Sequence, residues 1–343
     1  MAQSGGLPTV PLQAASAPSF ADWLAGVRAE AVARGISEAT VDRALDGLEP
    51  LPVVIQRDRT QAELIMPLDK YLARRLTPRL VRTARRMLAE HGALLRKVAA
   101  AYGLPPEVVV SLWGLESNFG RFSGVRPTMA ALATLAYDRR RSSLFHQELF
   151  AALTILDRGD IDPAKMKGSW AGAMGQPQFM PSSYLQFAED FDGDGQRDIW
   201  KSKADVFASI ANDLKAHGWV ASQPWGYAVQ LSKAVAARVE EEVPPREGGC
   251  EAMHQMRGPL PLARWQEQGV RLAGGRKLTG SFDASLVRAG RRAFLVSSNY
   301  DALLAYNCAH AYALSAALLA DRIRSAATGR DRTRRSALPS GPG

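Results

Sequence analysis

Residues 105–120 read PPEVVVSLWGLESNFG, and this stretch predicts an apolar helix. Four positions fall at i, i+3, i+4 and i+7, the spacing of one helical face: Val109, Leu112, Trp113 and Glu116. The two leading prolines favour a helix start, and Gly120 marks the far end. The pattern therefore places a carboxylate on the apolar stripe, at the C-terminal end of the helix.

Glu116 is the first candidate for a chemical role. Burial disfavours the charged form of a carboxylate, and the negative end of the helix dipole adds to that effect. Both raise the pKa toward the value that a general acid needs at neutral pH. Two structural alternatives stay open, because spacing alone also fits a buried Glu116 paired with an arginine or a solvated one past the helix end.

The composition is that of a globular protein with room for two or three subdomains. The chain has 343 residues, of which 46% are hydrophobic and 22% charged. No apolar run approaches the length of a membrane span. The net charge of +9 favours anionic partners such as nucleic acid, lipid headgroups or cell-wall polymer. Without a nucleic-acid motif or interleaved aromatic residues, we predict no nucleic-acid partner.

Helical patterns dominate the first two thirds of the chain, and the character changes near Trp225. We expect one basic helix from Thr77 to about Tyr102 and another helix from Asn299 to Ile323. The sequence predicts a mainly α fold of the α+β class. The expected parts are a disordered leader at 1–18, a helical region at 19–240, a small β-containing insertion at 241–298, a C-terminal helix returning to the core at 299–325, and a basic disordered tail at 326–343.

The N-terminal residues leave the route of export open. They lack a basic segment followed by an apolar one, so no signal peptide is readable. Residues 15–17, Ala-Ser-Ala, resemble a small-residue cleavage site. Either the upstream part of a signal is missing or the segment is a simple leader.

Residues 168–200 form a second informative segment, which begins with the glycine-rich run SWAGAMG at 169–175. Backbone without large side chains can approach a ligand closely. Amide and hydroxyl side chains follow beside aromatic rings, a combination that suits a sugar with its apolar faces and ring of hydroxyls: Trp170, Gln176, Gln178, Phe179, Ser182, Ser183 and Tyr184. The alternative is a tightly packed loop with glycines at its turns.

Residues 190–198, DFDGDGQRD, resemble the first half of an EF-hand Ca²⁺ loop. Carboxylates stand at loop positions 1, 3 and 5 and a glycine at position 6, but Lys201 replaces the usual glutamate at position 12. We predict one structural Ca²⁺, because a single loop is not typical of a sensor. The alternative is an acidic surface turn. The expected ligands are Asp190, Asp192, Asp194, the backbone carbonyl of Gln196, and Asp205 closing an enlarged loop, with Asp198 as an alternative ligand.

Together these segments resemble the B-type lytic murein transglycosylases, the periplasmic enzymes of glycoside hydrolase family 103. The resemblance rests on runs that occur in the family's order from about residue 20 to about residue 323: GLESNFG, SWAGAMGQPQFMPSSY, DFDGDGQRDIW, SIANDLKAHGW and FLVSSNYDALLAYN. It implies a lysozyme-like catalytic core with a helical flanking domain, a small β-containing domain and one Ca²⁺.

The resemblance also implies the reaction. Family members cleave the β-1,4 bond between N-acetylmuramic acid and N-acetylglucosamine without water and leave a 1,6-anhydromuramic acid end. Glu116 matches their sole catalytic carboxylate, which acts first as acid and then as base, assisted by the substrate's N-acetyl group. The residues implied to contact the glycan are Ser169, Gln178, Phe179, Tyr306 and Asn307, with Arg140 and Arg141 placed to bind acidic peptide stems. On sequence alone, the arginine run is also typical of a solvated face.

The chain departs from the family pattern at two positions. Asp213 stands where an aromatic residue is common, and Ala309 where a serine is common, so one stacking contact and one hydrogen bond are in doubt. Cys308 is also unusual there. We hypothesise that it pairs with Cys250 and ties the β-containing insertion to the cleft, the alternative being two free thiols.

Three functions remain to be weighed. The leading one is a lytic transglycosylase that acts on peptidoglycan glycan strands. The first alternative is a muramidase that admits water to the same bond, and the second is a non-catalytic peptidoglycan-binding protein with a structural Ca²⁺. We expect the protein in the periplasm or cell envelope, where this substrate lies. We also expect it to be a monomer, with complexes of cell-wall synthesis or division as further partners. The sequence does not settle endo or exo cleavage, the need for peptide stems, or a lipid anchor.

Overall fold

The computed structural model describes residues 18–60, 67–138, 140–290 and 292–327, and this part of the chain is mainly helical with two small sheets. The predicted α+β class, with helices predominating, is confirmed. The expected leader and tail lie outside the described residues, apart from Pro18 and the last two residues of the final helix. Among the described helices, no single one is both long and apolar enough to cross a membrane.

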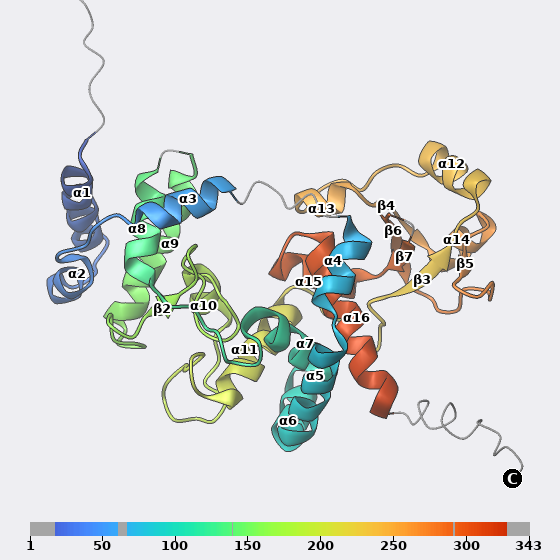
Figure 1. Ribbon diagram of the computed structural model, residues 1–343, viewed down its shortest axis with the longest axis horizontal. Coiled ribbons are helices and arrows are strands. Elements are labelled where there is room, and N and C mark those ends of the chain that lie inside the picture. Colours follow the sequence, from blue (N-terminus) through green and yellow to red (C-terminus); the bar gives the residue numbers. More distant parts are fainter. Residues whose placement is uncertain (1–17, 61–66, 139, 291, 328–343) are drawn as a thin grey trace, which may run out of the picture.

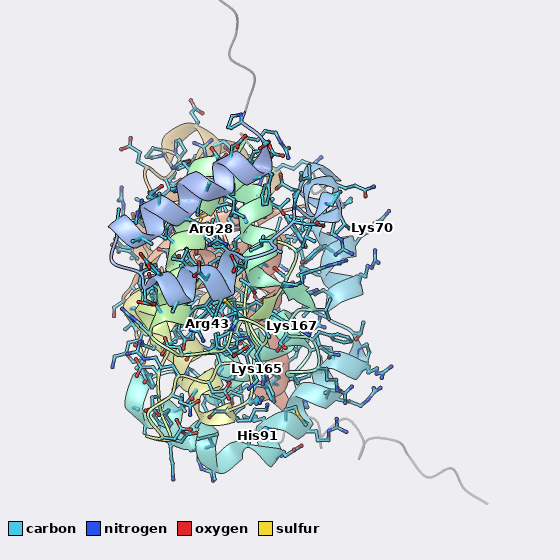
Figure 2. The ribbon with its side chains drawn as sticks, turned by 90° about the vertical axis from the view of Figure 1, so that its left-hand side faces the viewer. Arg28, Arg43, Lys70, His91, Lys165 and Lys167 are labelled. Atoms are coloured by element: carbon cyan, nitrogen blue, oxygen red, sulfur yellow. A yellow bond between two sulfur atoms is a disulfide. The ribbon has the colours of Figure 1, made fainter. Side chains whose placement is uncertain are left out.

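One group of helices, at the left of Figure 1, surrounds a core of its own. Helix α8 packs along α9, and α1 and α2 cover them. Arg28 joins α1 to α2 through ion pairs with Asp42 and Asp46, on the face that Figure 2 shows. The elements are α1 (Phe20–Ala33), α2 (Glu38–Leu45), α3 (Pro52–Thr60), α8 (Thr128–Tyr137), α9 (Ser142–Asp157), α10 (Pro181–Phe187) and the two-stranded sheet of β1 (Arg126–Pro127) and β2 (Lys167–Gly168).

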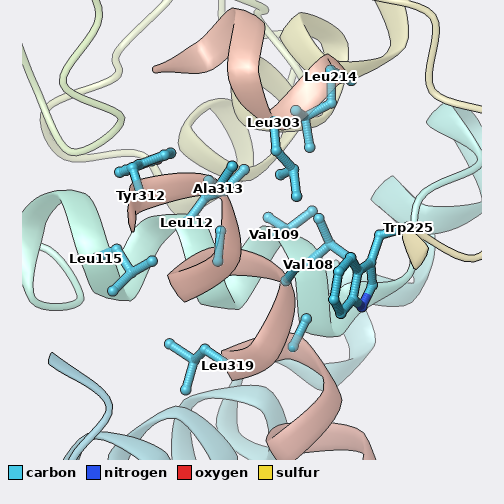
Figure 3. Packing of buried hydrophobic residues seen from close by; sticks show 14 of the residues in the cluster. Val108, Val109, Leu112, Leu115, Leu214, Trp225, Leu303, Tyr312, Ala313 and Leu319 are labelled. Atoms are coloured by element: carbon cyan, nitrogen blue, oxygen red, sulfur yellow. The ribbon is translucent and has the colours of Figure 1, made fainter. Parts of the chain in front are cut away.

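The second group packs around α7 (Pro106–Ser117), the helix predicted from residues 105–120. Residues on all of its sides are buried, including Val108 and Val110 as well as the expected stripe, so a single apolar face is too narrow a description. Figure 3 shows this packing against α15 and α16. The other helices of this group are α4 (Leu68–Arg75), α5 (Pro78–Glu90), α6 (Gly92–Tyr102), α11 (Lys203–Ala216), α15 (Ser298–Tyr306) and α16 (His310–Ala327), of which α5, α6, α11 and α16 pack against α7 directly.

Two helices expected to be continuous are broken, and both breaks let the chain turn around α7. The helix expected to begin at Thr77 divides at His91, whose ring packs edge-on against Trp113 and Phe207. The C-terminal helix divides between α15 and α16, which meet at a bend of 118°. Burial against a common core outweighs the local helical pattern at both points.

The β-containing part is an antiparallel sheet in the order β4-β6-β7-β3-β5, at the upper right of Figure 1. It includes residues before the expected boundary at 241, because β3 pairs with β7 along four residues. Its own apolar cluster includes Trp265 and Leu286. The elements are β3 (Gly226–Gln230), α12 (Lys233–Glu242), α13 (Glu251–His254), β4 (Arg257–Pro261), α14 (Leu262–Glu267), β5 (Arg271–Leu272), β6 (Asp283–Ala289) and β7 (Arg292–Val296).

A disulfide connects the β-containing part to the helical core. Cys250 precedes α13 and is bonded to Cys308, in the turn between α15 and α16, with 6.1 Å between the Cα atoms. The hypothesised pairing is thus confirmed. The bond fixes the short segment that follows Tyr306 and Asn307.

Replacing both cysteines by serine should lower the free energy of unfolding. The bridge closes a loop with a sequence separation of 58, for which the loss of denatured-state entropy corresponds to about 4 kcal/mol. Urea unfolding of oxidised wild type and of the Cys250→Ser, Cys308→Ser variant measures the difference. Equal midpoints and slopes would show that the bridge does not constrain the unfolded chain.

Candidate active site

Glu116 occupies the last turn of α7, where the backbone leaves the helix sharply. Asn118, Phe119 and Gly120 all have left-handed backbone conformations, with φ of 49°, 62° and 78°. A Cβ on Gly120 would lie 2.4 Å from Oε1 of Gln176, so the close approach of these two segments requires glycine. The turn directs the chain away immediately after the carboxylate.

Gln176 attaches the glycine-rich segment to α7. Its Oε1 accepts a hydrogen bond from Nε1 of Trp113 (2.8 Å), and its Nε2 donates to the backbone carbonyl of Trp200 (2.6 Å). Nζ of Lys203 donates to the same Oε1 (3.1 Å). Two segments that the sequence showed to be informative are therefore held together by one buried amide.

The Glu116 carboxyl is mostly enclosed by protein while its side chain keeps partial contact with solvent. Burial raises the pKa of Glu116 from its ordinary 4.5 to about 7, and the side-chain interaction with Tyr312 and the positive charge of Arg75 act in the opposite direction. The predicted upward shift is confirmed. Arg75 is held beside the helix end by donating from Nη2 to the carbonyl of Leu115 (2.7 Å).

Two tyrosines interact with this carboxyl, and a phenylalanine packs against one of them. The rings of Tyr312 and Tyr306 are stacked with centroids 6.3 Å apart, and Phe179 lies 5.9 Å from Tyr306. Burial raises the pKa of both tyrosines, and the charge of Glu116 adds to the effect, so both hydroxyls stay protonated. The Tyr306 hydroxyl donates to the carbonyl of Pro177 (2.6 Å), whereas the buried Tyr312 hydroxyl makes no hydrogen bond of standard geometry.

The structure places the remaining glycan-contact candidates on the surrounding loops. Oγ of Ser169 accepts from the backbone N–H groups of Ala171 (3.2 Å) and Ala173 (3.1 Å), which leaves its own proton available. Gln178 has a left-handed backbone (φ 56°) and donates from Nε2 to the carbonyl of Gly175 (2.8 Å). Asn307 is exposed at the end of α15.

Three hollows that share lining residues form one cleft along this site. The pocket at Glu116 has a volume of about 260 Å³. It shares Phe122 with a pocket of about 340 Å³ that Ser169 and Trp170 line, and Arg75 with a third of about 640 Å³. Phe122 is 68% exposed, and its aromatic face beside Glu116 suits stacking on a sugar. The sequence analysis did not identify Phe122, Arg75 or Tyr312 as site residues. Phe122 follows the end of the helical pattern of α7, and Arg75 and Tyr312 come close to Glu116 only in the folded structure.

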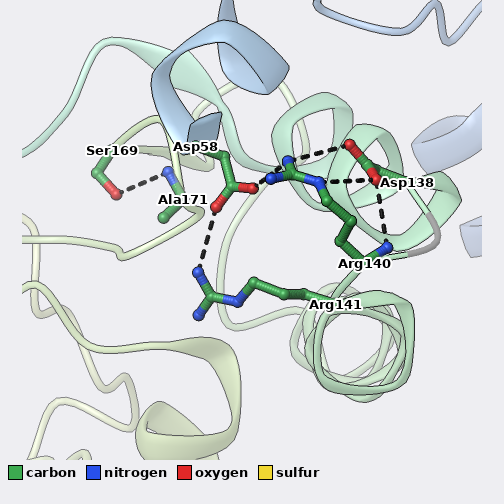
Figure 4. Close-up of polar contacts among 6 residues, drawn as sticks. All are labelled: Asp58, Asp138, Arg140, Arg141, Ser169 and Ala171. Atoms are coloured by element: carbon green, nitrogen blue, oxygen red, sulfur yellow. Dashed lines mark hydrogen bonds and ion pairs between the residues drawn. The ribbon is translucent and has the colours of Figure 1, made fainter. Parts of the chain in front are cut away.

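Arg140 and Arg141 converge on one nearly buried carboxylate. Asp58, whose side chain is 5% exposed, accepts from Nη2 of Arg140 (2.6 Å) and Nη1 of Arg141 (3.2 Å), as Figure 4 shows. Arg140 also pairs with Asp138 (3.3 Å). The two guanidiniums stay about half exposed, so they are oriented by Asp58 while keeping donors free.

The acidic loop gathers three of the predicted metal ligands. Oxygen atoms of Asp190, Asp192 and Asp194 lie within 4.8 Å of one another, which fits the oxygen-rich donor set that Ca²⁺ takes. Asp205 is fully buried and accepts from the backbone N–H groups of Phe191 (2.9 Å) and Asp198 (2.8 Å), so both of its oxygens clamp the loop.

The alternative ligand Asp198 has a local partner of its own. Its Oδ1 accepts from the backbone N–H groups of Trp200 and Lys201, both at 2.9 Å. The loop thus brings together the carboxylates of Asp190, Asp192 and Asp194, at positions 1, 3 and 5. Asp198 and Asp205 hold the loop in place by accepting hydrogen bonds from backbone N–H groups.

Asp213, at the position that departs from the family pattern, is buried beside His217. Its Oδ1 lies 3.1 Å from Nδ1 of His217. Burial raises the pKa of Asp213, and the hydrogen bond with Asp213 raises the pKa of His217. The carboxylate therefore has a local partner that an aromatic residue would not need.

Comparison with known proteins identifies the family. The model of the transglycosylase SLT domain matches residues 19–321. The chain belongs to this family. It is 41% identical over 152 residues to the membrane-bound lytic murein transglycosylase B of Escherichia coli strain K12, an alignment that spans 44% of this chain and 42% of the relative.

Solved structures of relatives share the fold of this SLT-family chain. SltB3 from Pseudomonas aeruginosa in complex with NAG-anhNAM-pentapeptide is 43% identical, with a TM-score of 0.81 over 89% of this chain and 80% of that one. The lytic transglycosylase SLT35 of Escherichia coli in complex with calcium is 27% identical, with a TM-score of 0.73 over 89% of this chain and 93% of that one. The resemblance to B-type lytic transglycosylases and their lysozyme-like fold is confirmed.

Substituting Glu116 by glutamine should stabilise the protein, but only at higher pH. The folded-state pKa of about 7 exceeds the ordinary 4.5, so the native state binds this proton more tightly and loses stability as pH rises between those values. Above pH 7 the wild type should be less stable than the variant by at most about 3 kcal/mol. At pH 5 the two should differ little.

Urea unfolding at pH 5 and pH 8 measures this difference. Glu107→Gln is the matched control, because it makes the same change at the opposite end of α7 and should not reproduce the effect. A Glu116→Gln variant that gains no stability at pH 8 would contradict the raised pKa.

Proposed function

We propose that this protein is a lytic transglycosylase that cleaves the β-1,4 bond between N-acetylmuramic acid and N-acetylglucosamine in peptidoglycan. The observation that carries the proposal is a single carboxylic acid in the cleft with a pKa of about 7. A group with that pKa is protonated often enough to act as acid and basic enough to recover the proton. The relatives support the substrate class, since SltB3 is seen with NAG-NAM-pentapeptide.

In the first step, Glu116 donates its proton to the glycosidic oxygen as that oxygen leaves C1 of the muramyl residue. The resulting carboxylate faces Arg75 and Tyr312, which both favour the charged form. The substrate's N-acetyl group assists at C1. Glu116 is then ready to act as base without moving.

In the second step, the C6 hydroxyl of the muramyl residue attacks C1 while Glu116 takes its proton. The products are a 1,6-anhydromuramic acid end and a free N-acetylglucosamine end, and Glu116 regains its starting state. Glycosidases with two catalytic carboxylates use the second one to activate a water molecule or to form a covalent intermediate. Among the described residues that line the Glu116 pocket, Glu116 is the sole carboxylate.

Around this centre, we assign glycan contacts to Ser169, Gln178, Phe179, Tyr306 and Asn307. Arg140 and Arg141, which Asp58 orients, would bind acidic peptide stems of the substrate. We propose that the enzyme acts in the cell envelope, where peptidoglycan lies, and that it is a monomer. We also assign one structural Ca²⁺ to the acidic loop, where it would neutralise the clustered carboxylates of Asp190, Asp192 and Asp194.

Mass spectrometry of the products released from purified peptidoglycan tests the reaction. Wild type should release fragments with 1,6-anhydro ends, lighter by one water than reducing ends, and Glu116→Gln should release none while still binding the glycan. The value of kcat/KM should fall as pH rises through about 7, because the acid must start protonated. Reducing ends would identify a muramidase, and intact binding without products would identify a binding protein.

Calcium should raise the melting temperature of wild type relative to a chelator. An ion that binds only the folded state stabilises it by mass action. Asp192→Ala with Asp194→Ala should abolish that difference. Glu49→Ala with Glu247→Ala removes the same charge at exposed positions and should keep it. If the melting temperature of wild type is the same with added calcium and after exhaustive chelation, the assignment of a structural Ca²⁺ is contradicted.

A further inference from the structure

Lys203 follows the acidic loop and carries a positive charge to a partly buried position beside α7. It is the first residue of α11. The N-terminal end of a helix is itself positive, so the helix dipole disfavours a cation there, as burial also does. Burial lowers the pKa of Lys203, and the negative charge of Asp198 acts in the opposite direction. A lysine at such a position needs specific contacts to stabilise it.

The contacts of Lys203 join it to two residues that are already bonded to each other. Its Nζ donates to Oε1 of Gln176 (3.1 Å), the atom that also accepts from Nε1 of Trp113 (2.8 Å). The same Nζ lies 5.5 Å from the centroid of the Trp113 ring, within the range of a cation–π interaction. Flipping the Gln176 amide would turn its NH₂ group toward both donors, so Lys203 and Trp113 together fix its orientation.

This amide lies between the turn after Glu116 and the segment to which we assign glycan contacts. Its Oε1 packs against the left-handed turn, since a Cβ on Gly120 would lie 2.4 Å from that oxygen. Along the chain, Gln178 and Phe179 follow Gln176 by two and three residues. The orientation of the amide therefore sets where the turn lies relative to the glycan-contact segment.

The backbone that carries Lys203 is anchored by the acidic loop. Oγ of Ser202 donates to Oδ2 of Asp192 (2.7 Å) and caps α11 by accepting from the backbone N–H of Asp205 (3.3 Å). Asp205 in turn accepts the two backbone hydrogen bonds that clamp the loop. The ammonium thus reaches Gln176 from a helix start that is itself held in place.

We propose that Lys203 is a positioning residue for the reaction at Glu116 and that it acts through Gln176. The inference rests on the proposed function, in which Glu116 must meet first the glycosidic oxygen and then the C6 hydroxyl. A small shift of the turn relative to the bound glycan lowers the rate of both steps. Lys203 is not among the described residues that line the Glu116 pocket, so its loss should lower kcat more than it raises KM.

Initial rates on soluble peptidoglycan strands compare wild type with Lys203→Met, which keeps the side-chain length and removes the charge and the donor. The value of kcat should fall at least about tenfold while KM changes by less than about twofold. The fall of kcat/KM with pH should keep its midpoint near 7, because Lys203 acts by position and not by its charge on Glu116. Lys215→Met removes an exposed lysine from the last turn of the same helix and should keep the wild-type kcat.

A second comparison tests the route. In a Gln176→Met background, Lys203→Met should cause no further loss of kcat, because the contact through which it acts is already gone. A further loss there would overturn the inference, since Lys203 would then act by another route. A Lys203→Met enzyme that melts at a lower temperature but keeps the wild-type kcat would also overturn it and leave Lys203 a purely structural role.

A readout without turnover separates this inference from the proposed function. If wild type forms no anhydro products, the proposed function fails by itself, and ¹H–¹⁵N NMR of the Trp113 indole still decides the contact. The Nε1–H resonance should move in Lys203→Met and stay in place in Lys215→Met, because Lys203 shares the acceptor of that N–H group. A resonance that does not move in Lys203→Met would overturn the inference.

Discussion

The site depends on keeping one carboxylic acid largely out of water while leaving it in reach of a glycan. Glu116 meets both conditions because it ends a helix that is buried on all sides, at the point where the chain turns into the cleft. Burial alone would hold the acid too firmly protonated to serve as a base. Arg75 and Tyr312 offset part of that effect and bring the pKa to about 7.

Much of the surrounding structure serves to hold that geometry. The left-handed turn after Glu116 can approach Gln176 closely because Gly120 carries no Cβ, and Gln176 in turn accepts a hydrogen bond from Trp113 of α7. Asp205 clamps the acidic loop by two backbone hydrogen bonds. The disulfide from Cys308 holds the segment that follows Tyr306. Each feature lies in a different stretch of sequence, and all of them meet around α7.

The sequence revealed the parts of the site that depend on local patterns. Spacing and elementary electrostatics predict the helix that carries Glu116 in its last turn, the raised pKa of Glu116, and the clustered carboxylates of Asp190, Asp192 and Asp194, and the structure bears them out. The family motifs added the lysozyme-like fold. The roles assigned to Ser169, Gln178 and Asn307 remain predictions.

The features that the sequence did not reveal arise from tertiary contacts. Continuous helical patterns gave no sign of the breaks at His91 and before α16, because packing against α7 decides where those helices end. Arg75 precedes Glu116 by 41 positions and reads as one of many surface arginines until the fold places it at the helix end.

The pKa of Glu116 is the quantity on which the mechanism rests, and carbon-13 NMR of selectively labelled glutamate side chains measures it directly. One carboxyl resonance should titrate with a midpoint near 7 and be absent from the spectrum of Glu116→Gln. A Glu116 resonance that titrates near 4.5, like an ordinary exposed carboxyl, would contradict the assignment of this residue as the acid that starts the reaction.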